Sequence, residues 1–258
     1  MRLATFNLLH GRSPHDGVVD PARLHASARE LDADVLALQE VDRGQDRSGH
    51  VDQTALVAEA LGAGHARFAP VLIGTPGWQW RTARPADDAT DPAYGVGLVS
   101  RHPVARWRRI ALGGSPARLP VLIDGRRLAL VRDEPRVAVA AVLAPPAPVA
   151  TVVAVHLSFA PGVNVLQLLR LARALRDAPR PLVVLGDLNL PGPVPTAVLP
   201  GWRSLARAVT FPTTAPSLQL DHALARDDPT RPLPAVERAF AMPVEVSDHR
   251  ALVVDLGC

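Results

Sequence analysis

The sequence predicts an α+β fold in which two packed, mainly antiparallel β-sheets are flanked by helices. Three observations support this prediction. Short apolar runs recur between turn residues, only two or three segments have helical periodicity, and strands and helices do not alternate strictly. The chain has 258 residues, 48% of them hydrophobic, and no internal repeat or low-complexity linker. We therefore expect a single domain over residues 1–258.

The first half of the chain is predicted to contain two helices and four strands. Residues 21–31 follow Asp20, a plausible helix cap, and place proline at the first helical position. Residues 53–61 form the second helix, which ends at a glycine. Residues 78–92 are predicted to be a surface loop. The strands of this half are residues 3–9, 34–41, 95–100 and 104–112. We expect the last two to pair around Arg101-His102-Pro103.

The second half is predicted to contain one clear helix and six strands. The helix spans residues 165–178, and its apolar residues at helical spacing are Leu166, Leu169, Ala172 and Leu175. The strands are residues 137–143, 149–157, 182–186, 218–225, 236–242 and 251–256. We expect the first two to form a hairpin, because the proline-rich segment 144–148 between them cannot donate ladder hydrogen bonds.

Composition excludes several classes of protein. No apolar run approaches the roughly 20 residues that a membrane span requires. The N-terminal residues 1–12 are too short and polar for a signal peptide and are expected to form a strand, so a cytoplasmic location is predicted. The single cysteine, Cys258, allows neither an internal disulfide nor a cysteine metal cluster, and a catalytic thiol is not expected at a terminus.

Charge gives a weaker indication of the ligand. All 28 basic residues are arginine, and the net charge is only +3. Composition bias explains this total better than selection for phosphate binding does. Residues 101–136 contain nine arginines and only three acidic residues. This stretch is interpreted either as a basic face for a nucleic-acid backbone or as a solvated β-edge. The modest net charge argues against strong non-specific DNA binding.

Polar side chains recur at the ends of the predicted apolar strands. They are Asn7, Gln39-Glu40, Asp187-Leu188-Asn189, Asp221-His222 and Asp248-His249. A single acid in such a place is usually a turn or a cap. If these acids converge at one edge of a sandwich, they would repel one another strongly without a divalent cation. Carboxylate and amide oxygens suit Mg²⁺ or Mn²⁺ better than Zn²⁺, and no H-E-x-x-H motif supports a zinc hydrolase.

Two histidines share these positions. His156 ends a predicted apolar strand, and His249 follows Asp248 directly. A histidine beside acids can act as a general acid or bind a phosphate oxygen. A structural role is more common for a lone histidine after a strand, but two at equivalent strand ends favour the functional interpretation.

The chain resembles the endonuclease/exonuclease/phosphatase superfamily, which includes pancreatic deoxyribonuclease, apurinic-site endonucleases, sphingomyelinases and inositol polyphosphate phosphatases. The resemblance covers nearly the whole chain and implies a four-layer α/β sandwich. Six motifs carry it, in this order: Thr5-Phe6-Asn7, Leu38-Gln39-Glu40-Val41, Val155-His156-Leu157, Gly186-Asp187-Leu188-Asn189, Leu220-Asp221-His222 and Ser247-Asp248-His249.

The resemblance also implies a metal site. Glu40 would be the principal ligand of a Mg²⁺ or Mn²⁺ ion, and Asp248 would contribute to the same site. Asn7 would orient the phosphate or take part in a second metal site. The activity implied is hydrolysis of phosphate esters, by a phosphodiesterase, nuclease or phosphatase, without a covalent enzyme intermediate.

Five further residues are implied as catalytic. Asp187 would position or deprotonate the attacking water, and Asn189 would hold a phosphate oxygen. His249 would stabilise the transition state while Asp221 orients its ring. His156 would contact the phosphate.

Some features leave alternatives open. The segment Tyr94-Gly95-Val96-Gly97-Leu98 lacks an asparagine that many small members carry, so a catalytically inactive binding module on the same fold is the alternative function. Arg136 is interpreted either as a basic residue found in parts of the family or as a solvated strand end. The loop residues His10, His15 and His50 either line the cleft or are simply exposed. The substrate is expected to be a phosphate ester, with nucleic acid one option, and neither a membrane nor an obligate protein partner is indicated.

Overall fold

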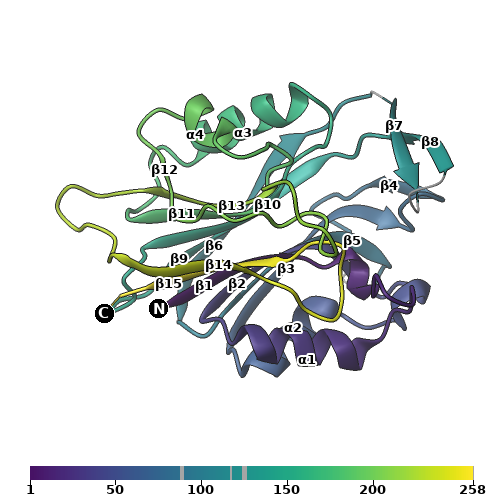
Figure 1. Cartoon of the computed structure of the whole chain (residues 1–258), viewed down its shortest axis with the longest axis horizontal. Coiled ribbons are helices and arrows are strands. Elements are labelled where there is room, and N and C mark those ends of the chain that lie inside the picture. Colours follow the sequence, from purple (N-terminus) through teal and green to yellow (C-terminus); the bar gives the residue numbers. More distant parts are fainter. Residues whose placement is uncertain (88–89, 117, 124–126, 258) are drawn as a thin grey trace.

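The computed structural model describes residues 1–87, 90–116, 118–123 and 127–257, and two stacked β-sheets form its centre (Figure 1). The seven-stranded sheet has the order β14 (Val236–Met242), β15 (Ala251–Leu256), β1 (Arg2–Asn7), β2 (Val35–Arg43), β5 (Ala93–Ser100), β3 (His65–Gly74) and β4 (Trp80–Thr82). The six-stranded sheet has the order β12 (Arg203–Ser204), β13 (Asp221–Arg226), β11 (Leu182–Asp187), β10 (Thr151–His156), β9 (Arg136–Leu143) and β6 (Val104–Gly113).

Helices cover the outer face of each sheet, which gives four layers and confirms the predicted fold class. Figure 1 shows α1 (Pro21–Leu31) and α2 (Gln53–Leu61) below the seven-stranded sheet, and α3 (Val163–Ala174) and α4 (Val194–Val198) above the six-stranded sheet. Three apolar clusters match this layering: one lies between the sheets and one lies under each helical layer. Short 3₁₀ helices occur at Leu9–Gly11 and Asp46–Ser48. No helix among the described residues is long and apolar enough to cross a membrane.

Two parallel strand pairs set the position of the polar strand ends. β1 is parallel to β2, and β10 is parallel to β11, whereas the other neighbouring strands are antiparallel. Each parallel pair is joined through a helix, α1 or α3, as a parallel crossover requires. Parallel strands end at the same edge of a sheet. This geometry brings the residues at the ends of these strands to one end of the sandwich.

A third sheet is a separate antiparallel ribbon of two strands, β7 (Arg118–Ile123) and β8 (Arg127–Arg132). In Figure 1 it projects at the end of the molecule away from the two termini, where β1 also ends. The ribbon therefore belongs to the same end of the sandwich as the polar strand ends.

The sequence predicted several element bounds correctly. The helices Pro21–Leu31 and Gln53–Leu61 and the strands Val236–Met242 and Ala251–Leu256 have the expected limits. Asp20 accepts a hydrogen bond from the backbone of Ala22, so it caps α1 as expected. The hairpin of β9 and β10 is also confirmed.

The predicted pairing of the strands around Arg101-His102-Pro103 is wrong. β5 lies in the seven-stranded sheet and β6 in the six-stranded sheet, so this turn carries the chain from one sheet to the other. The backbone N–H of Arg101 donates to the carbonyl of Asp34 at 2.8 Å, which fixes the turn beside β2. The predicted loop 78–92 contains β4, which pairs with the end of β3, while residues 88 and 89 lie outside the described residues.

The predicted apolar stripe of α3 is also displaced. Leu166 and Leu169 are 56% and 44% exposed, whereas Leu168 and Leu171 are buried. The buried face carries Leu168 and Leu171 together with Gln167, whose amide donates to the carbonyl of Gly113 and accepts from the backbone of Ser158. A polar residue is tolerated on this face because its amide is hydrogen-bonded at both ends.

Candidate active site

The candidate site lies between the two sheets, at the end of the sandwich where the parallel strands end. Asn7 and Glu40 come from β1 and β2, while His156 and Asp187 end β10 and β11. Asp221 begins β13 and stands opposite Asp187 in the ladder. The site is completed by the loop before β15, which contains Asp248 and His249. The structure thus brings residues from all six motifs to one end of the molecule.

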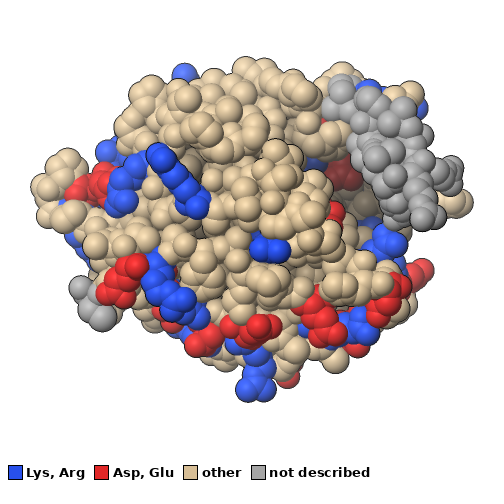
Figure 2. All heavy atoms as spheres, viewed as in Figure 1, with Lys and Arg blue, Asp and Glu red and all other residues tan. Residues whose placement is uncertain are grey.

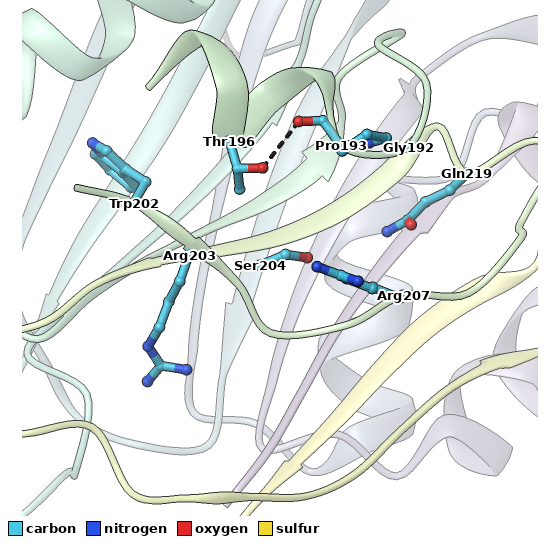
Figure 3. A pocket seen from close by; sticks show the side chains of 8 residues that line it. All are labelled: Gly192, Pro193, Thr196, Trp202, Arg203, Ser204, Arg207 and Gln219. Carbon is cyan, nitrogen blue, oxygen red and sulfur yellow. Dashed lines mark hydrogen bonds between the residues drawn. The ribbon is translucent and has the colours of Figure 1, made fainter. Parts of the chain in front are cut away.

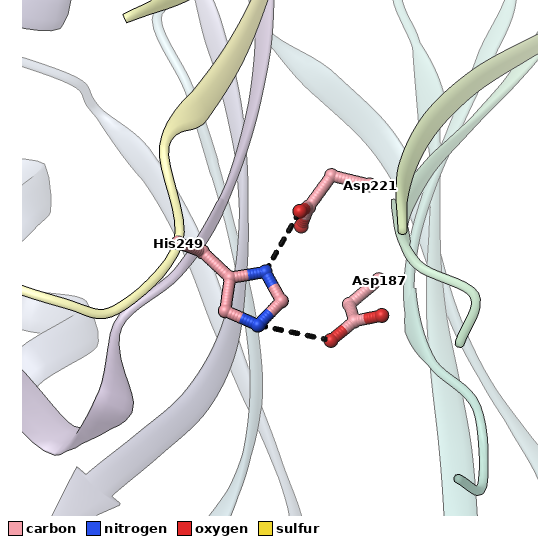
Figure 4. Close-up of side chains that lie close together, drawn as sticks. All are labelled: Asp187, Asp221 and His249. Carbon is pink, nitrogen blue, oxygen red and sulfur yellow. Dashed lines mark hydrogen bonds and ion pairs between the residues drawn. The ribbon is translucent and has the colours of Figure 1, made fainter. Parts of the chain in front are cut away.

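His249 and Asp221 form a buried ion pair. The Nδ1 atom of His249 lies 2.8 Å from Oδ2 of Asp221, and its Nε2 atom lies 3.8 Å from Oδ2 of Asp187 (Figure 4). The ring of Phe211 packs against the imidazole at 4.8 Å between centroids. Burial alone would lower the pKa of His249, but Asp221 and then Asp187 and Asp248 raise it to about 10. The imidazole is therefore protonated near neutral pH.

Asp187 is the centre of the hydrogen-bond network. Its Oδ1 accepts from the backbone of Asn189 at 2.9 Å, and its Oδ2 accepts from the amide of Asn7 at 3.1 Å. Oδ2 also lies 3.5 Å from Nε2 of His156. Burial raises the pKa of this carboxyl, and the positive charge of His249 lowers it in part. A carboxylate with a raised pKa is suited to accept a proton.

Asn7 connects the two sheets. Its amide nitrogen donates to Oε1 of Glu40 at 3.1 Å and to Oδ2 of Asp187 at 3.1 Å. Its Oδ1 accepts from the backbone of Leu9, and its backbone carbonyl accepts from the hydroxyl of Ser247. Both amide hydrogens are thus used on carboxylates from different sheets, which holds these carboxylates at a fixed separation.

Three non-glycine residues at the site have left-handed backbone conformations. Their φ angles are 54° at Glu40, 49° at Asn189 and 78° at Ser247. At Glu40 the ladder between β2 and β5 shifts register, so the strand bulges where the carboxylate leaves it. Asparagine tolerates this conformation well, but for glutamate it costs on the order of 1 kcal/mol. Such conformations concentrate at sites where side-chain direction matters.

The oxygen atoms around Glu40 fit a divalent cation. Burial raises the pKa of Glu40, its hydrogen bond from Asn7 lowers it, and the nearby charges of Asp248 and Glu134 raise it further. Such mutual repulsion is relieved by a bound cation. Carboxylates such as those of Glu40 and Asp248 would suit Mg²⁺ or Mn²⁺, whereas Asn7 turns its amide nitrogen toward Glu40 and its amide oxygen toward the backbone of Leu9.

A second acidic cluster lies beside it. One ligand atom each from Asp187, Asp221 and His249 lies within 4.8 Å of the others, which would also suit a metal ion. However, Nδ1 of His249 is bonded to Asp221, and a protonated ring cannot ligate. One oxygen of Asp221, Oδ1, is buried and has no hydrogen-bond partner. Both this cluster and the surroundings of Glu40 are therefore candidate positions for a cation.

Arg136 fixes the tautomer of His156. Its Nη1 lies 3.2 Å from Nδ1 of His156, and because a guanidinium can only donate, Nδ1 must accept. Burial and then the charge of Arg136 hold the pKa of His156 well below its usual value, so the ring is neutral. A neutral ring that accepts at Nδ1 carries its proton on Nε2, toward Asp187. The amide of Asn189, 3.3 Å from Nε2, donates instead to the carbonyl of Leu157.

Arg136 is only 5% exposed, so its interpretation as a solvated strand end is wrong. Of the loop histidines, His15 and His50 are exposed. His10 is mostly buried, and burial followed by the charges of Arg47 and Arg12 lowers its pKa to about 3. The loop histidines therefore differ: only His10 is held inside the fold.

Gly95, in the segment that lacks the expected asparagine, lies very close to β3. A Cβ atom at Gly95 would lie 2.1 Å from the carbonyl of Ala69, so no other residue fits without movement of β3. Tyr94 is buried, and Arg47 lies over its ring at 5.8 Å. Arg47 also forms a two-point ion pair with Asp42. Arg47 could not be identified from the sequence because it lies in the short 3₁₀ helix Asp46–Ser48, outside any motif, and only the tertiary fold shows its partners.

Among the described residues, the three main surface grooves are not lined by the candidate site residues. A groove of about 420 Å³ lies beside α4 and β12, where Arg203 points away from it and Arg207 points toward Ser204 (Figure 3). Arg203 is paired with Asp227 at 2.6 Å. On the face in Figure 2, a small basic group lies over the region of β12, and acidic and basic groups alternate along the lower margin. No continuous basic surface is visible on this face.

Comparison with known proteins gives one family. The sequence model described as "Endonuclease/Exonuclease/phosphatase family" matches residues 4–249. No protein in the curated collection of sequences matches. Similar solved structures include an endonuclease/exonuclease/phosphatase from Beutenbergia cavernae, at 24% identity and a TM-score of 0.64, with coverage of 100% of this chain and 72% of that chain.

Two other similar structures have more specific descriptions. A mannosyl-6-phosphatase from Bacteroides thetaiotaomicron is 14% identical, with a TM-score of 0.62 and full coverage of both chains. TDP2 from D. rerio, complexed with a single-strand DNA product, is 15% identical, with a TM-score of 0.63 and coverage of 100% of this chain and 99% of that chain. At these identities the likeness concerns the fold.

Proposed function

The chain belongs to the endonuclease/exonuclease/phosphatase family, and on that premise we propose that it hydrolyses phosphate esters with the help of a divalent cation. Members of this family are phosphoester hydrolases and depend on divalent metals. The observation that carries the proposal is the buried network in which Asn7 joins Glu40 to Asp187, with the His249–Asp221 pair beside it. Family membership alone would not require this network to be intact.

Glu40 and Asp248 would hold the cation, with Asn7 beside them. The choice rests on oxygen donors and on the repulsion that raises the pKa of Glu40. A bound Mg²⁺ or Mn²⁺ ion would supply positive charge for the phosphate oxygens as negative charge develops. The orientation of Glu40 is fixed by Asn7, which is why a change at Asn7 should also affect the metal site.

The proton transfers and the binding of the phosphate would be carried out by five side chains of the site. Asp187, with its raised pKa, would accept the proton of the attacking water, while Asn189 would hold a phosphate oxygen. His249 would donate from Nε2 to a phosphate oxygen, and Asp221 keeps this ring charged and oriented. His156 would act as a neutral donor through Nε2. The displacement would occur in one step, without a covalent intermediate.

The substrate class proposed is a phosphodiester or a phosphomonoester. One similar structure is a sugar phosphatase by its description, and another holds a DNA product, so the fold accommodates both kinds of ester. The alternative is an inactive binding module on the same fold, which the missing asparagine and Arg136 motivated; the buried network of Asn7, Glu40 and Asp187 favours the hydrolase instead. The single domain over residues 1–258 and the cytoplasmic location stay predictions.

Hydrolysis of bis(4-nitrophenyl) phosphate and 4-nitrophenyl phosphate, each with Mg²⁺, Mn²⁺ or EDTA, tests the proposal. We expect Asp187→Asn to lower kcat by about 100-fold or more, because general-base catalysis is worth that much. The matched control is Asp177→Asn, since Asp177 is exposed on the surface. Equal activity of the two variants would show that Asp187 is not the base.

A further inference from the structure

A second groove lies at the open edge between the two sheets. Its volume is about 680 Å³, and residues of β3 and β6 form its walls. β6 is the last strand of its sheet, and β4 covers only Leu72–Gly74 of β3, so the start of β3 is a free edge among the described residues. The groove therefore follows two neighbouring strand edges rather than the loops that carry the candidate active site.

Two arginines face each other across this groove. Arg67 of β3 stands opposite Leu98, and Arg109 of β6 stands opposite Val139. Leu98 and Val139 both belong to the core between the sheets, so Arg67 and Arg109 project from the same inner faces toward the gap. Arg109 donates to the carbonyl of Pro70 at 3.2 Å and so reaches from one sheet to the other.

The groove has an excess of positive charge. Arg43 and Arg84 also line the groove, and among the described residues of its lining Asp87 is the one acid. Asp87 is already held by Arg81 at 2.8 Å. Arg67 is exposed, and it has no ion-pair partner within the described part of the chain. Several guanidinium groups around a groove favour a ligand with more than one phosphate.

Aromatic side chains complete the lining. Arg43 lies over the ring of Phe68 at 5.0 Å, and Trp107 is half-buried and packs against the core between the sheets. A positively charged groove with aromatic side chains is the typical binding surface for single-stranded nucleic acid. Charges that merely protect an edge strand need to lie only on that strand. Here they come from β2, β3, β6 and the segment after β4, which favours a shared ligand.

We propose that this groove binds the backbone of a single-stranded polynucleotide and guides it to the candidate active site. The proposal rests on the proposed function, and it assigns polynucleotides as the substrate class. Arg109 pairs with Val139, which is three residues from Arg136 along β9. At a rise of about 3.3 Å per residue, the groove begins roughly 10 Å from the arginine that contacts His156. A chain held there extends to the site over a few nucleotides.

Binding of a fluorescently labelled oligothymidylate of about 20 nucleotides, followed by anisotropy in EDTA at about 50 to 200 mM salt, tests the proposal. The double variant Arg67→Gln/Arg109→Gln removes two charges from the groove. The matched control, Arg29→Gln/Arg207→Gln, removes two charges from exposed positions on α1 and beside the other groove. We expect the groove variant to weaken binding about tenfold, and its plot of log affinity against log salt to be shallower by about 1.4.

The small esters separate this inference from the proposed function. The groove variant should hydrolyse bis(4-nitrophenyl) phosphate at the rate of the unmodified protein, while its KM for a long oligonucleotide rises. Equal weakening by the two double variants, or no weakening by either, would overturn the groove as the binding site. If the unmodified protein does not hydrolyse the small esters, the proposed function is contradicted. The binding comparison in EDTA would still show whether the groove binds the oligonucleotide.

Discussion

At the scale of single residues, the contact between Arg136 and His156 determines which atom of the histidine can donate. A permanently charged donor at Nδ1 excludes the tautomer with its proton there, and it also disfavours the charged ring. In the proposed mechanism His156 would therefore act as a neutral donor, and His249, beside Asp221, as a charged one. The positive charge of Arg136 favours the neutral form of His156, and the negative charge of Asp221 favours the protonated form of His249.

Replacement of Arg136 by methionine should release this constraint. We expect the His156 ring to populate both neutral tautomers, and kcat for a nitrophenyl phosphodiester to fall about tenfold, the worth of one hydrogen bond to a charged group. ¹⁵N NMR of histidine-labelled protein reports which ring nitrogen carries the proton. Arg29→Met, on the surface of α1, is the control. A proton on Nδ1 in the unmodified protein would refute the tautomer assignment.

At the scale of elements, the buried face of α3 combines leucines with one hydrogen-bonded amide. Gln167 is buried and bonded at both ends of its amide, and Leu168 lies beside it in the core while Leu166 faces outward. We expect Leu168→Ala to lower the free energy of unfolding by about 2–5 kcal/mol, and Leu166→Ala by less than about 0.5 kcal/mol. Urea unfolding measures both. Similar losses in the two variants would contradict the assigned face.

The strand ends explain how far the sequence could predict the site. The motifs at Asn7, Glu40, Asp187, Asp221 and His249 could be found because each follows or precedes an apolar run, and parallel strands end together. The roles of Arg136 and Arg47 could not be predicted, because their partners lie far away in the sequence. Likewise, β5 and β6 were assigned to one hairpin, since a short turn between strands does not reveal that the chain changes sheets.

At the scale of the whole molecule, the site depends on the packing of one sheet on the other. The hydrogen bond from Asn7 to Asp187 and the ion pair of His249 with Asp221 both cross between the sheets. Neither sheet holds a complete set of residues. The arrangement of the candidate site therefore depends on the packing of the sheets, and destabilising conditions should disturb it before complete unfolding.

His10 should make the global stability sensitive to acid. Its pKa in the folded protein is about 3, below its usual value of 6.5. Between pH 3 and pH 6.5, the histidine is therefore protonated in the unfolded chain but not in the folded protein. The stabilisation is fully present above pH 6.5 and is lost as the pH falls toward 3. We expect His10→Asn, which tolerates the left-handed backbone at this position, to flatten this fall. His15→Asn, at an exposed position, should leave it unchanged. Thermal unfolding between pH 7 and pH 4 provides the comparison.

Dependence of phosphodiester hydrolysis on both the cation and Glu40 is the most direct test of the central claim. The measurement is the rate of bis(4-nitrophenyl) phosphate hydrolysis during Mg²⁺ titration, for the unmodified protein, Glu40→Gln and the exposed control Glu59→Gln. We predict saturable activation and complete loss in EDTA for the unmodified protein and the control, and at least about 100-fold lower kcat for Glu40→Gln. Activity that persists in EDTA, or full activity of Glu40→Gln, would contradict the account.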